Sequence, residues 1–378
     1  MAAPIQIFEL TNSTLMVGLL GLAQFPALFL GSFLGGVLAD SRDRRNLYLM
    51  SQVILAIFTV GLAVNASVDN PSIALVYVLT AANAFMSGID SPARSAAIPR
   101  IVSAANLPSA LALQVLMMQT AGAVGPAIAG VAISQLGLAA VYWLDVATFV
   151  AAIVTALAMA PLPPASGTKG AGLKSMVDGI RFLRSRESLK GVFLIDINAM
   201  VFGMPRALFP EFGLGVLGGT EATVGYLYAA PGVGAMAAAL TSGWVARVRR
   251  LGRATTFAVM AWGLGIAGFG LSRWLWLGLI CLALAGAGDA ISAVFRSTIL
   301  QLTTPDHLRG RLSAVQIAVV AGGPRLGDAE AGIVATGFGP RVAAWSGGLA
   351  ATAGAFVIAQ MFPRFRDWTR RDSDANDP

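Results

Sequence analysis

The chain has 378 residues, of which 56% are hydrophobic and only 12% are charged. Ordinary soluble domains carry about 25% charged residues, so this composition excludes a soluble protein. The single cysteine, Cys281, and the single histidine, His307, leave little for a disulfide framework, a metal site or a nucleophilic enzyme. We therefore predict no catalytic residues, no metal and no cofactor. The formal charge of +7 lies mainly in short loops, which argues against nucleic acid as a partner.

Apolar stretches long enough to cross a bilayer recur along the whole chain. Charged or Gly/Pro-rich breaks divide them into eleven complete spans, at roughly 14–38, 47–65, 72–90, 106–133, 138–160, 190–212, 222–246, 254–272, 274–296, 311–335 and 339–361. The pattern predicts an all-α polytopic membrane protein.

One long polar segment separates the spans into two groups. We predict an N-terminal transmembrane half over 1–160, a cytoplasmic linker over 161–189, a C-terminal transmembrane half over 190–363 and a cytoplasmic tail over 364–378. Apolar residues recur at helical spacing in the linker, which predicts an interfacial amphipathic helix that contains Leu173, Met176, Val177, Ile180 and Leu183. A simple tether between the halves would explain the segment equally well.

The basic residues indicate the orientation. Lysine and arginine gather in alternate connections, at residues 42–45, 94–100, 169–190, 247–253, 296–311 and 364–371. Cytoplasmic loops of membrane proteins are enriched in these residues. We therefore predict that this side, the linker and the C-terminus are cytoplasmic, in a bacterial-type inner membrane.

The two halves resemble each other at an offset of about 200 residues. Matching pairs occur in the same order, namely Arg94-Ser95 with Arg296-Ser297, Gly125-Pro126 with Gly323-Pro324, and Trp143 with Trp345. Parallel repeats of this kind are a common design of transporters. Pro205 follows an apolar half-span, whereas its counterpart Pro4 follows three residues. We predict a twelve-span, two-half fold with most of the first span missing; a genuine eleven-span protein with an outside N-terminus is the alternative.

The connection after the first complete span contains an acidic residue within a basic cluster. It resembles the loop motif between the second and third spans of the major facilitator superfamily, with Ser41 and Asp43 departing from the family pattern. An aspartate at a helix end beside arginines can latch a neighbouring helix. The resemblance predicts a gating role for Gly36, Asp40, Arg42, Arg44 and Arg45. A topogenic basic loop would explain the arginines but not Asp40.

A second motif lies in the span at 106–133. It resembles the antiporter motif of drug:proton exporters of the same superfamily, with Ala129 in place of one glycine, and consists of Gly122, Gly125, Pro126 and Gly130. Small residues and a proline bend a helix and allow close packing. Ordinary helix packing is therefore the alternative to a role in antiport.

Three further segments resemble the enterobactin-exporter branch of the superfamily. They run from Asp90 to Arg94, from Phe295 to Arg311, and from Gly322 to Asp328. We place Asp90, Arg94, Arg296, Arg309 and Arg311 in cytoplasmic loops. The resemblance covers nearly the whole chain and implies a central cavity that opens alternately to each side and exports siderophores or drugs.

Ionisable residues inside predicted spans are functional candidates, because each costs about 2.5–3.5 kcal/mol at mid-helix. Arg325 and Asp328 have the spacing of a pair on one helical face, and Glu330 lies beside them. A proton-carrying carboxylate and a static ion pair both fit this cluster. The remaining candidates for proton coupling or for the cavity wall are Asp196, Arg206, Asp145 and Asp289.

These observations predict a secondary active exporter that exchanges small amphipathic compounds for protons by alternating access. The expected partners are the substrate, protons and the lipid bilayer, and we expect a monomer. No phosphate-binding Gly-x-x-x-x-Gly-Lys-Ser/Thr segment occurs in the sequence. A facilitator or importer of a metabolite or lysolipid in the same fold is one alternative. A non-transporting membrane fragment is the other.

Overall fold

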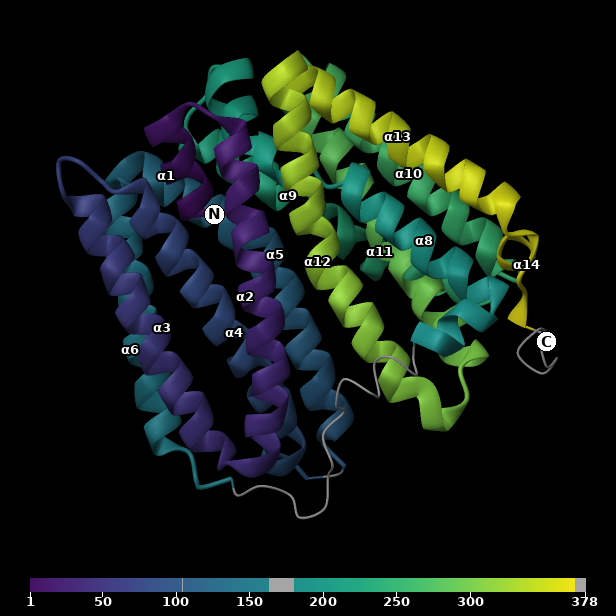
Figure 1. Ribbon diagram of the computed structural model, residues 1–378, viewed down its shortest axis with the longest axis horizontal. Coiled ribbons are helices and arrows are strands. Elements are labelled where there is room, and N and C mark those ends of the chain that lie inside the picture. Colours follow the sequence, from purple (N-terminus) through teal and green to yellow (C-terminus); the bar gives the residue numbers. More distant parts are fainter. Residues whose placement is uncertain (104, 163–179, 371–378) are drawn as a thin grey trace.

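The computed structural model describes residues 1–103, 105–162 and 180–370, and this part of the chain is almost entirely helical. Two bundles lie side by side, with the first half of the chain at the left of Figure 1 and the second at the right. The first bundle contains α1 (Ala2–Thr11), α2 (Thr14–Ser41), α3 (Arg44–Ser67), α4 (Ile73–Ile101), α5 (Leu107–Leu136) and α6 (Leu138–Ala158). The second contains α8 (Glu187–Phe202), η1 (Arg206–Leu208), η2 (Glu211–Val216), α9 (Glu221–Leu240), η3 (Ser242–Arg247), α10 (Leu251–Leu271), α11 (Leu275–Thr303), α12 (Asp306–Phe338), α13 (Pro340–Met361) and α14 (Pro363–Arg366). The predicted all-α, two-half architecture is confirmed.

Ten helical segments of the described chain are long and apolar enough to cross a membrane, namely α2, α3, α4, α5, α6, α8 together with η1, α9, α10, α11 and α13. Helix α12 has 33 residues but carries charged side chains along its length. It packs against α8 and α13 of its own bundle and against α2 of the first bundle. Each of the predicted spans therefore has a helix, and the twelve-span fold is supported approximately, since α1 has only 10 residues.

Polar caps and glycine turns fix the helix ends. Ser13 and Asp43 cap α2 and α3 by accepting hydrogen bonds from backbone N–H groups in the first turn of each helix. Single glycines join α5 to α6 and α12 to α13: Gly137 has φ 82° and Gly339 has φ 85°, a region that favours glycine. The same turn at corresponding places of both halves agrees with the predicted repeat.

The helix connections gather at two faces of the molecule. We name the end that holds residues 42–43, 102–103 and 304–305 the linker face, and the end that holds residues 12–13, 137 and 339 the opposite face (Figure 1). The long helices run between these faces, so each helix has one part near the linker face and one part near the opposite face.

The two halves meet most closely near the opposite face, where α2 packs on α12 and α5 packs on α9. Glycines allow these helices to approach. A Cβ added to Gly332 would lie 3.0 Å from the Cα of Leu15, and one added to Gly225 would lie 2.8 Å from the Cα of Gly130. The Thr14 hydroxyl also donates a hydrogen bond to the carboxylate of Glu211, which joins α2 to η2. The opposite face is therefore the closed end of the boundary between the halves.

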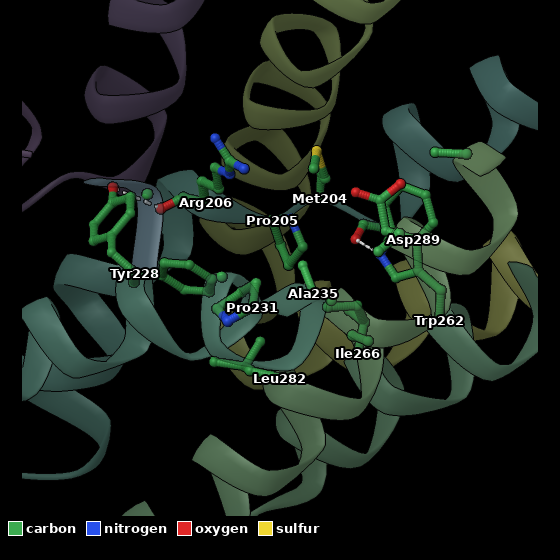
Figure 2. Close-up of a pocket in the computed structure, with 18 of the residues that line it drawn as sticks. Met204, Pro205, Arg206, Tyr228, Pro231, Ala235, Trp262, Ile266, Leu282 and Asp289 are labelled. Carbon is green, nitrogen blue, oxygen red and sulfur yellow. Dashed lines mark hydrogen bonds between the residues drawn. The ribbon is translucent and has the colours of Figure 1, made fainter. Parts of the chain in front are cut away.

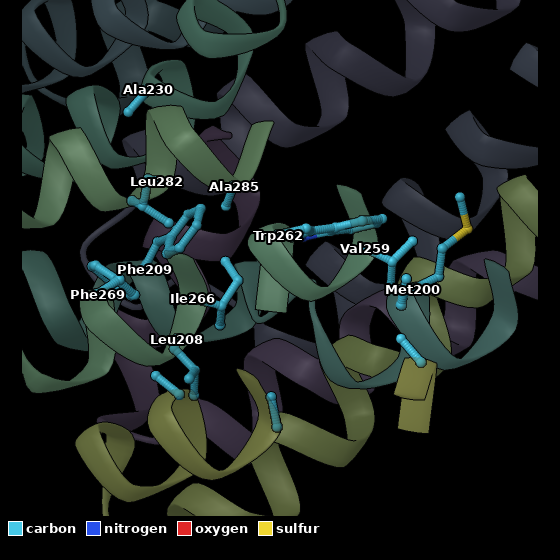
Figure 3. Packing of buried hydrophobic residues seen from close by; sticks show 14 of the residues in the cluster. Met200, Leu208, Phe209, Ala230, Val259, Trp262, Ile266, Phe269, Leu282 and Ala285 are labelled. Carbon is cyan, nitrogen blue, oxygen red and sulfur yellow. The ribbon is translucent and has the colours of Figure 1, made fainter. Parts of the chain in front are cut away.

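The largest buried apolar cluster lies mainly in the second half (Figure 3). Aromatic rings form part of it: Phe212 and Phe269 have ring centroids 4.3 Å apart, and Phe209 meets Phe269 edge-to-face at 5.7 Å. Trp262 and Ile266 of α10 belong to the same cluster. This packing gives the second half a rigid framework beside the cavity described below.

The described end of the predicted linker lies against the second half. Residues 180–185 are helical, and Ile180 and Leu183 from the predicted apolar stripe pack against a buried cluster that includes Leu189. The other residues of the stripe, at 173–177, lie outside the described part of the chain.

Candidate functional site

The predicted span at 190–212 is interrupted near its middle; it is the sixth complete span of the sequence and the seventh span of the twelve-span fold. Helix α8 ends at Phe202, the short 3-10 helix η1 begins at Arg206, and the π-helix η2 follows from Glu211. Pro205 contributes to the interruption because it has no backbone N–H and cannot continue a regular helix. At membrane depth, the backbone groups released by such a break need partners within the protein, because no lipid group can replace them.

Side chains of neighbouring helices supply these partners (Figure 2). The indole N–H of Trp262 in α10 donates to the carbonyl oxygen of Gly203 at 2.8 Å. The hydroxyl of Tyr228 in α9 donates to the carbonyl oxygen of Arg206 at 3.0 Å. The break is therefore tied to two helices of the second half.

Asp328 in α12 supplies a third partner for the break. Its Oδ1 accepts a hydrogen bond from the backbone N–H of Ala207 at 2.8 Å, and the residue is buried. A Cβ added to Gly21 in α2 would lie 3.2 Å from the other carboxylate oxygen of Asp328. Asp328 thus lies where the break, α12 and the first half of the chain meet.

A cavity of about 350 Å³ lies beside the break. Its wall combines α5 of the first half with the break, α9, α10 and α11 of the second half, and includes Gln119, Met204, Tyr228, Trp262, Ile266 and Asp289 (Figure 2). Small-molecule sites are typically mostly apolar and aromatic, with a few polar groups that orient the ligand. The position and composition of this cavity fit such a site.

Two charged residues of the described chain line the cavity, Arg206 and Asp289. Arg206 is exposed, and none of the ion pairs within the described chain involves its guanidinium. The side chain of Asp289 is 32% exposed, and its Oδ1 lies 3.6 Å from Nη2 of Arg296. The cavity therefore offers a ligand one group of each sign.

Arg296 connects Asp289 to a buried ion pair. Nη1 of Arg296 lies 2.5 Å from Oδ1 of Asp196 in α8, and both side chains are 4% exposed. The prediction that Arg296 lies in a cytoplasmic loop is wrong, because α11 continues past it to Thr303. Buried charges are tolerated when they are closely paired, and this pair joins α8 to α11.

The other residues predicted in loops on this side are also helical. Asp90 is buried in α4, where its Oδ1 accepts a hydrogen bond from Nε2 of Gln52 at 3.1 Å. Arg94 is on the same helix and lines a second cavity, together with Gln114 and Met117 of α5. The loop prediction fails here because α4 continues to Ile101, well beyond the apolar stretch that marked the span. Helix α12 likewise begins at Asp306 and includes two more of these residues, Arg309 and Arg311.

The structure separates the other predicted intramembrane charges. Arg325 and Glu330 are half-buried in α12, and no ion pair within the described chain joins Arg325 to Asp328. Asp145 is exposed on α6 beside the hydroxyl of Thr148, and it lines neither cavity. Of the predicted candidates, Asp196, Arg206 and Asp289 are thus brought together near the main cavity, and Asp328 lies behind the break.

One arginine of the predicted gating loop, Arg45, contacts the end of α6. Nε and Nη2 of Arg45 donate to the carbonyl oxygens of Ala156 and Leu157, at 3.1 and 2.6 Å. Arg44 is buried, and Arg42 is exposed. Gly36 has open space around it. The side chain of Asp40 lies outside the described residues, so the predicted latch stays a prediction.

The glycines of the antiporter-like motif differ in their surroundings. A Cβ added to Gly130 would lie 2.7 Å from the Cα of Gly225 in α9, whereas Gly125 faces open space. Gly122 lines the main cavity. Pro126 lies within α5, and its carbonyl oxygen is 2.6 Å from the Cβ position of Gly225. The motif therefore combines contact between the halves with access to the cavity.

Comparison with known proteins identifies the family. The family model described as transmembrane secretion effector matches residues 2–378. The chain belongs to this family. The enterobactin exporter EntS of Citrobacter koseri is 33% identical over 331 residues, which cover 88% of this chain and 79% of that protein. EntS of Escherichia coli O81 is also 33% identical over 331 residues, with the same coverage. These matches confirm the predicted resemblance to the enterobactin-exporter branch of the major facilitator superfamily.

Solved transporters share the fold. A bacterial homologue of the human lysosomal transporter Spinster, in an inward-facing and unoccupied conformation, gives a TM-score of 0.72 at 15% identity and covers 97% of this chain and 93% of its own. The nucleoside transporter NupG gives a TM-score of 0.69 at 14% identity, over 95% of this chain and 93% of its own. The protein is thus a multi-pass membrane transporter of an exporter family.

Two features of the site were missed by the sequence analysis. Trp262 and Tyr228 were not predicted to bind the broken backbone, because nothing in the sequence pairs α10 or α9 with residues 203–206. The break itself has a visible signal, since Gly203 and Pro205 interrupt an apolar run at its middle.

Proposed function

We propose that this protein exports small amphipathic compounds of the siderophore type in exchange for protons, by alternating access across the bacterial inner membrane. The cavity of about 350 Å³ at the break of the seventh span carries this proposal. Secondary transporters commonly bind substrate at discontinuous helices between their two halves. The substrate class is taken from the relatives, which are named enterobactin exporters.

In this proposal the linker face is cytoplasmic, because the basic residues of the sequence gather there. The close contacts of α2 with α12 and of α5 with α9 then block the path to the outside. Large apolar side chains such as Phe33 and Met118 are exposed on α2 and α5 toward the linker face. We infer that this conformation is the one that loads substrate from the cytoplasm and the inner leaflet.

The chemistry of the cavity suits an aromatic, acidic or phenolic compound. Tyr228 offers aromatic surface to a ring, and the exposed guanidinium of Arg206 offers charge-assisted hydrogen bonds to a phenolate or carboxylate oxygen.

The first test is efflux from a bacterial host that lacks its own exporters. A catecholate siderophore and a panel of amphipathic dyes are loaded, and efflux is measured with and without an uncoupler. The parent protein is compared with Arg206→Gln and with the matched control Arg273→Gln, an exposed residue between α10 and α11. We expect uncoupler-sensitive efflux in the parent and in Arg273→Gln. Loss of a charged hydrogen bond, worth about 1.5–3 kcal/mol, should slow siderophore efflux by Arg206→Gln about tenfold or more.

Two results would contradict the proposal in different ways. Efflux that continues unchanged after the gradient collapses would exclude proton antiport while leaving export intact. No efflux of the siderophore or any dye, despite normal amounts of protein in the membrane, would reject the export function.

A further inference from the structure

Asp289 differs from the other buried carboxylates of the second half in its access to the cavity. Its side chain lines the cavity and is 32% exposed. The side chain of Asp196 is only 4% exposed and Asp328 is buried, and each is already held by a close partner, Arg296 or the Ala207 N–H. A ligand or a proton in the cavity therefore meets Asp289 first.

Arg296 faces two carboxylates and can neutralise only one of them. It is closer to Asp196, at 2.5 Å, than to Asp289, at 3.6 Å. The Coulomb attraction weakens with distance, so Asp196 is the better compensated carboxylate. With both carboxylates ionised the three groups carry a net charge of −1. Arg296, Asp196 and Asp289 can thus accept one further positive charge together. That charge would bind at Asp289, because Asp289 is the carboxylate that the cavity reaches.

Groups on the neighbouring elements define the surroundings of Asp289. Arg206 on the break and Tyr228 on α9 are the other ionisable side chains of the cavity wall in the described chain, and Asp196 approaches from α8. The contributions of α5 and α10 include uncharged residues, Gln119 and Trp262. No second carboxylate in the described wall competes with Asp289 for a proton inside the cavity.

We propose that Asp289 is the proton-binding group of this transporter, and that proton and substrate compete for it. Arg296 and Asp196 are positioning residues that hold the carboxylate in the cavity wall. This inference rests on the proposed export function. When the cavity faces the cytoplasm, an entering substrate places a hydrogen-bond donor or a cationic group against Asp289, and the proton leaves to the cytoplasm. When the cavity faces outward, the substrate departs and a proton from outside binds the same carboxylate.

The test measures proton release on substrate binding. Purified full-length parent protein, Asp289→Asn, Asp289→Glu and the surface control Asp69→Asn are titrated with a catecholate siderophore in weakly buffered solution containing a pH indicator. Binding is followed in parallel by quenching of tryptophan fluorescence at several pH values. In the parent we expect release of up to about one proton per bound substrate, and an affinity that weakens by up to about tenfold per unit of acidification.

Asp289→Asn should bind substrate with no proton release and no pH dependence, because its side chain does not titrate. Asp289→Glu should restore both, and Asp69→Asn should behave as the parent. In proteoliposomes, Asp289→Asn should equilibrate substrate down its gradient but fail to drive accumulation with an imposed pH gradient. Size-exclusion chromatography and thermal unfolding verify that each variant is folded.

Proton release by Asp289→Asn equal to that of the parent would overturn the proposal. Loss of binding in both Asp289→Asn and Asp289→Glu would also overturn it, since a merely structural carboxylate would behave in this way. Failure of the parent itself to bind or export any compound is a different result, because it rejects the proposed function.

Discussion

Asp328 Oδ1 accepts the backbone N–H of Ala207 at 2.8 Å, so a carboxylate of α12 completes the hydrogen bonding of a broken span far away in the sequence. Intramembrane carboxylates are often considered first as ion carriers. This contact gives Asp328 a different task, because one of its oxygens is engaged by the backbone while the other faces Gly21.

Substitution of Asp328 separates these two roles. Asp328→Asn keeps an oxygen that accepts the Ala207 N–H, so we expect uncoupler-sensitive efflux and a thermal unfolding midpoint close to that of the parent. Asp328→Ala leaves the N–H without a partner, which costs about 1–3 kcal/mol, and should lower the midpoint and the yield of folded protein. Efflux assays and thermal unfolding in detergent measure both effects. Loss of coupled efflux in a normally stable Asp328→Asn would show that Asp328 carries the proton.

The contact of Gly130 with Gly225 predicts how the opposite face closes. Gly130→Ala places a Cβ 2.7 Å from the Cα of Gly225, so α5 and α9 must move apart. We expect the closed contact between the halves to weaken. The reporter is Glu221→Cys in a Cys281→Ser background, and its thiol should react several times faster with a membrane-impermeant maleimide. Gly125→Ala is the matched control, because open space surrounds Gly125. Equal reactivity in the two glycine variants would show that this contact does not control closure.

The hydrogen bonds of Arg45 lead us to predict that the loop between α2 and α3 stabilises the fold. Arg45 donates to carbonyl groups in the last turn of α6, where a cation also interacts favourably with the helix dipole. Arg45→Gln should therefore lower stability by about 1–3 kcal/mol, measured by thermal unfolding. Arg42→Gln, at an exposed position of the same loop, should change it much less. Similar losses in both variants would indicate that loop charge, rather than this contact, is responsible.

From the ion pairs of Asp367 we predict how the stability of the segment after α13 depends on pH. Hydrogen bonds from Arg366 and Arg253 lower the pKa of Asp367 to about 2, from an ordinary value of 3.8. A lowered pKa means that the contact stabilises the segment above pH 3.8 and is lost as the pH falls toward 2. We expect Asp367→Asn to reproduce this loss at neutral pH and to speed hydrogen exchange of residues 362–370. Unchanged exchange in Asp367→Asn, relative to the control Asp69→Asn, would contradict this.

Much of the fold follows from the sequence because membrane spans have a simple physical requirement. Each predicted span corresponds to a helix of the described chain, and the turns at Gly137 and Gly339 agree with the repeat. The predicted boundaries fail where a helix extends beyond its apolar stretch, since α11 includes Arg296 in a buried pair. An arginine in the sequence marks the end of a span only if its charge has no partner in the interior.

The candidate site is predicted less completely than the fold. Asp196, Arg206 and Asp289 are recognisable because ionisable residues are rare at membrane depth. Their roles depend on Arg296, Trp262 and Tyr228, which approach from other helices. Periodicity places a residue on a face of its own helix, but it contains no information about which helix lies opposite. The predicted pairing of Arg325 with Asp328 has the same weakness, because periodicity could not show that Asp328 would accept the backbone N–H of Ala207.

The hydrogen bonds around the broken span have a consequence for the transport cycle. Trp262, Tyr228 and Asp328 attach residues 203–207 to α10, α9 and α12, all within the second half. The break should therefore move with this half as one body, and a bound compound would travel with it. Within the described chain, α5 is the part of the cavity wall that belongs to the first half. A bound compound would thus keep its contacts with the second half throughout the transport cycle. Its contacts with α5 of the first half would be the ones that change.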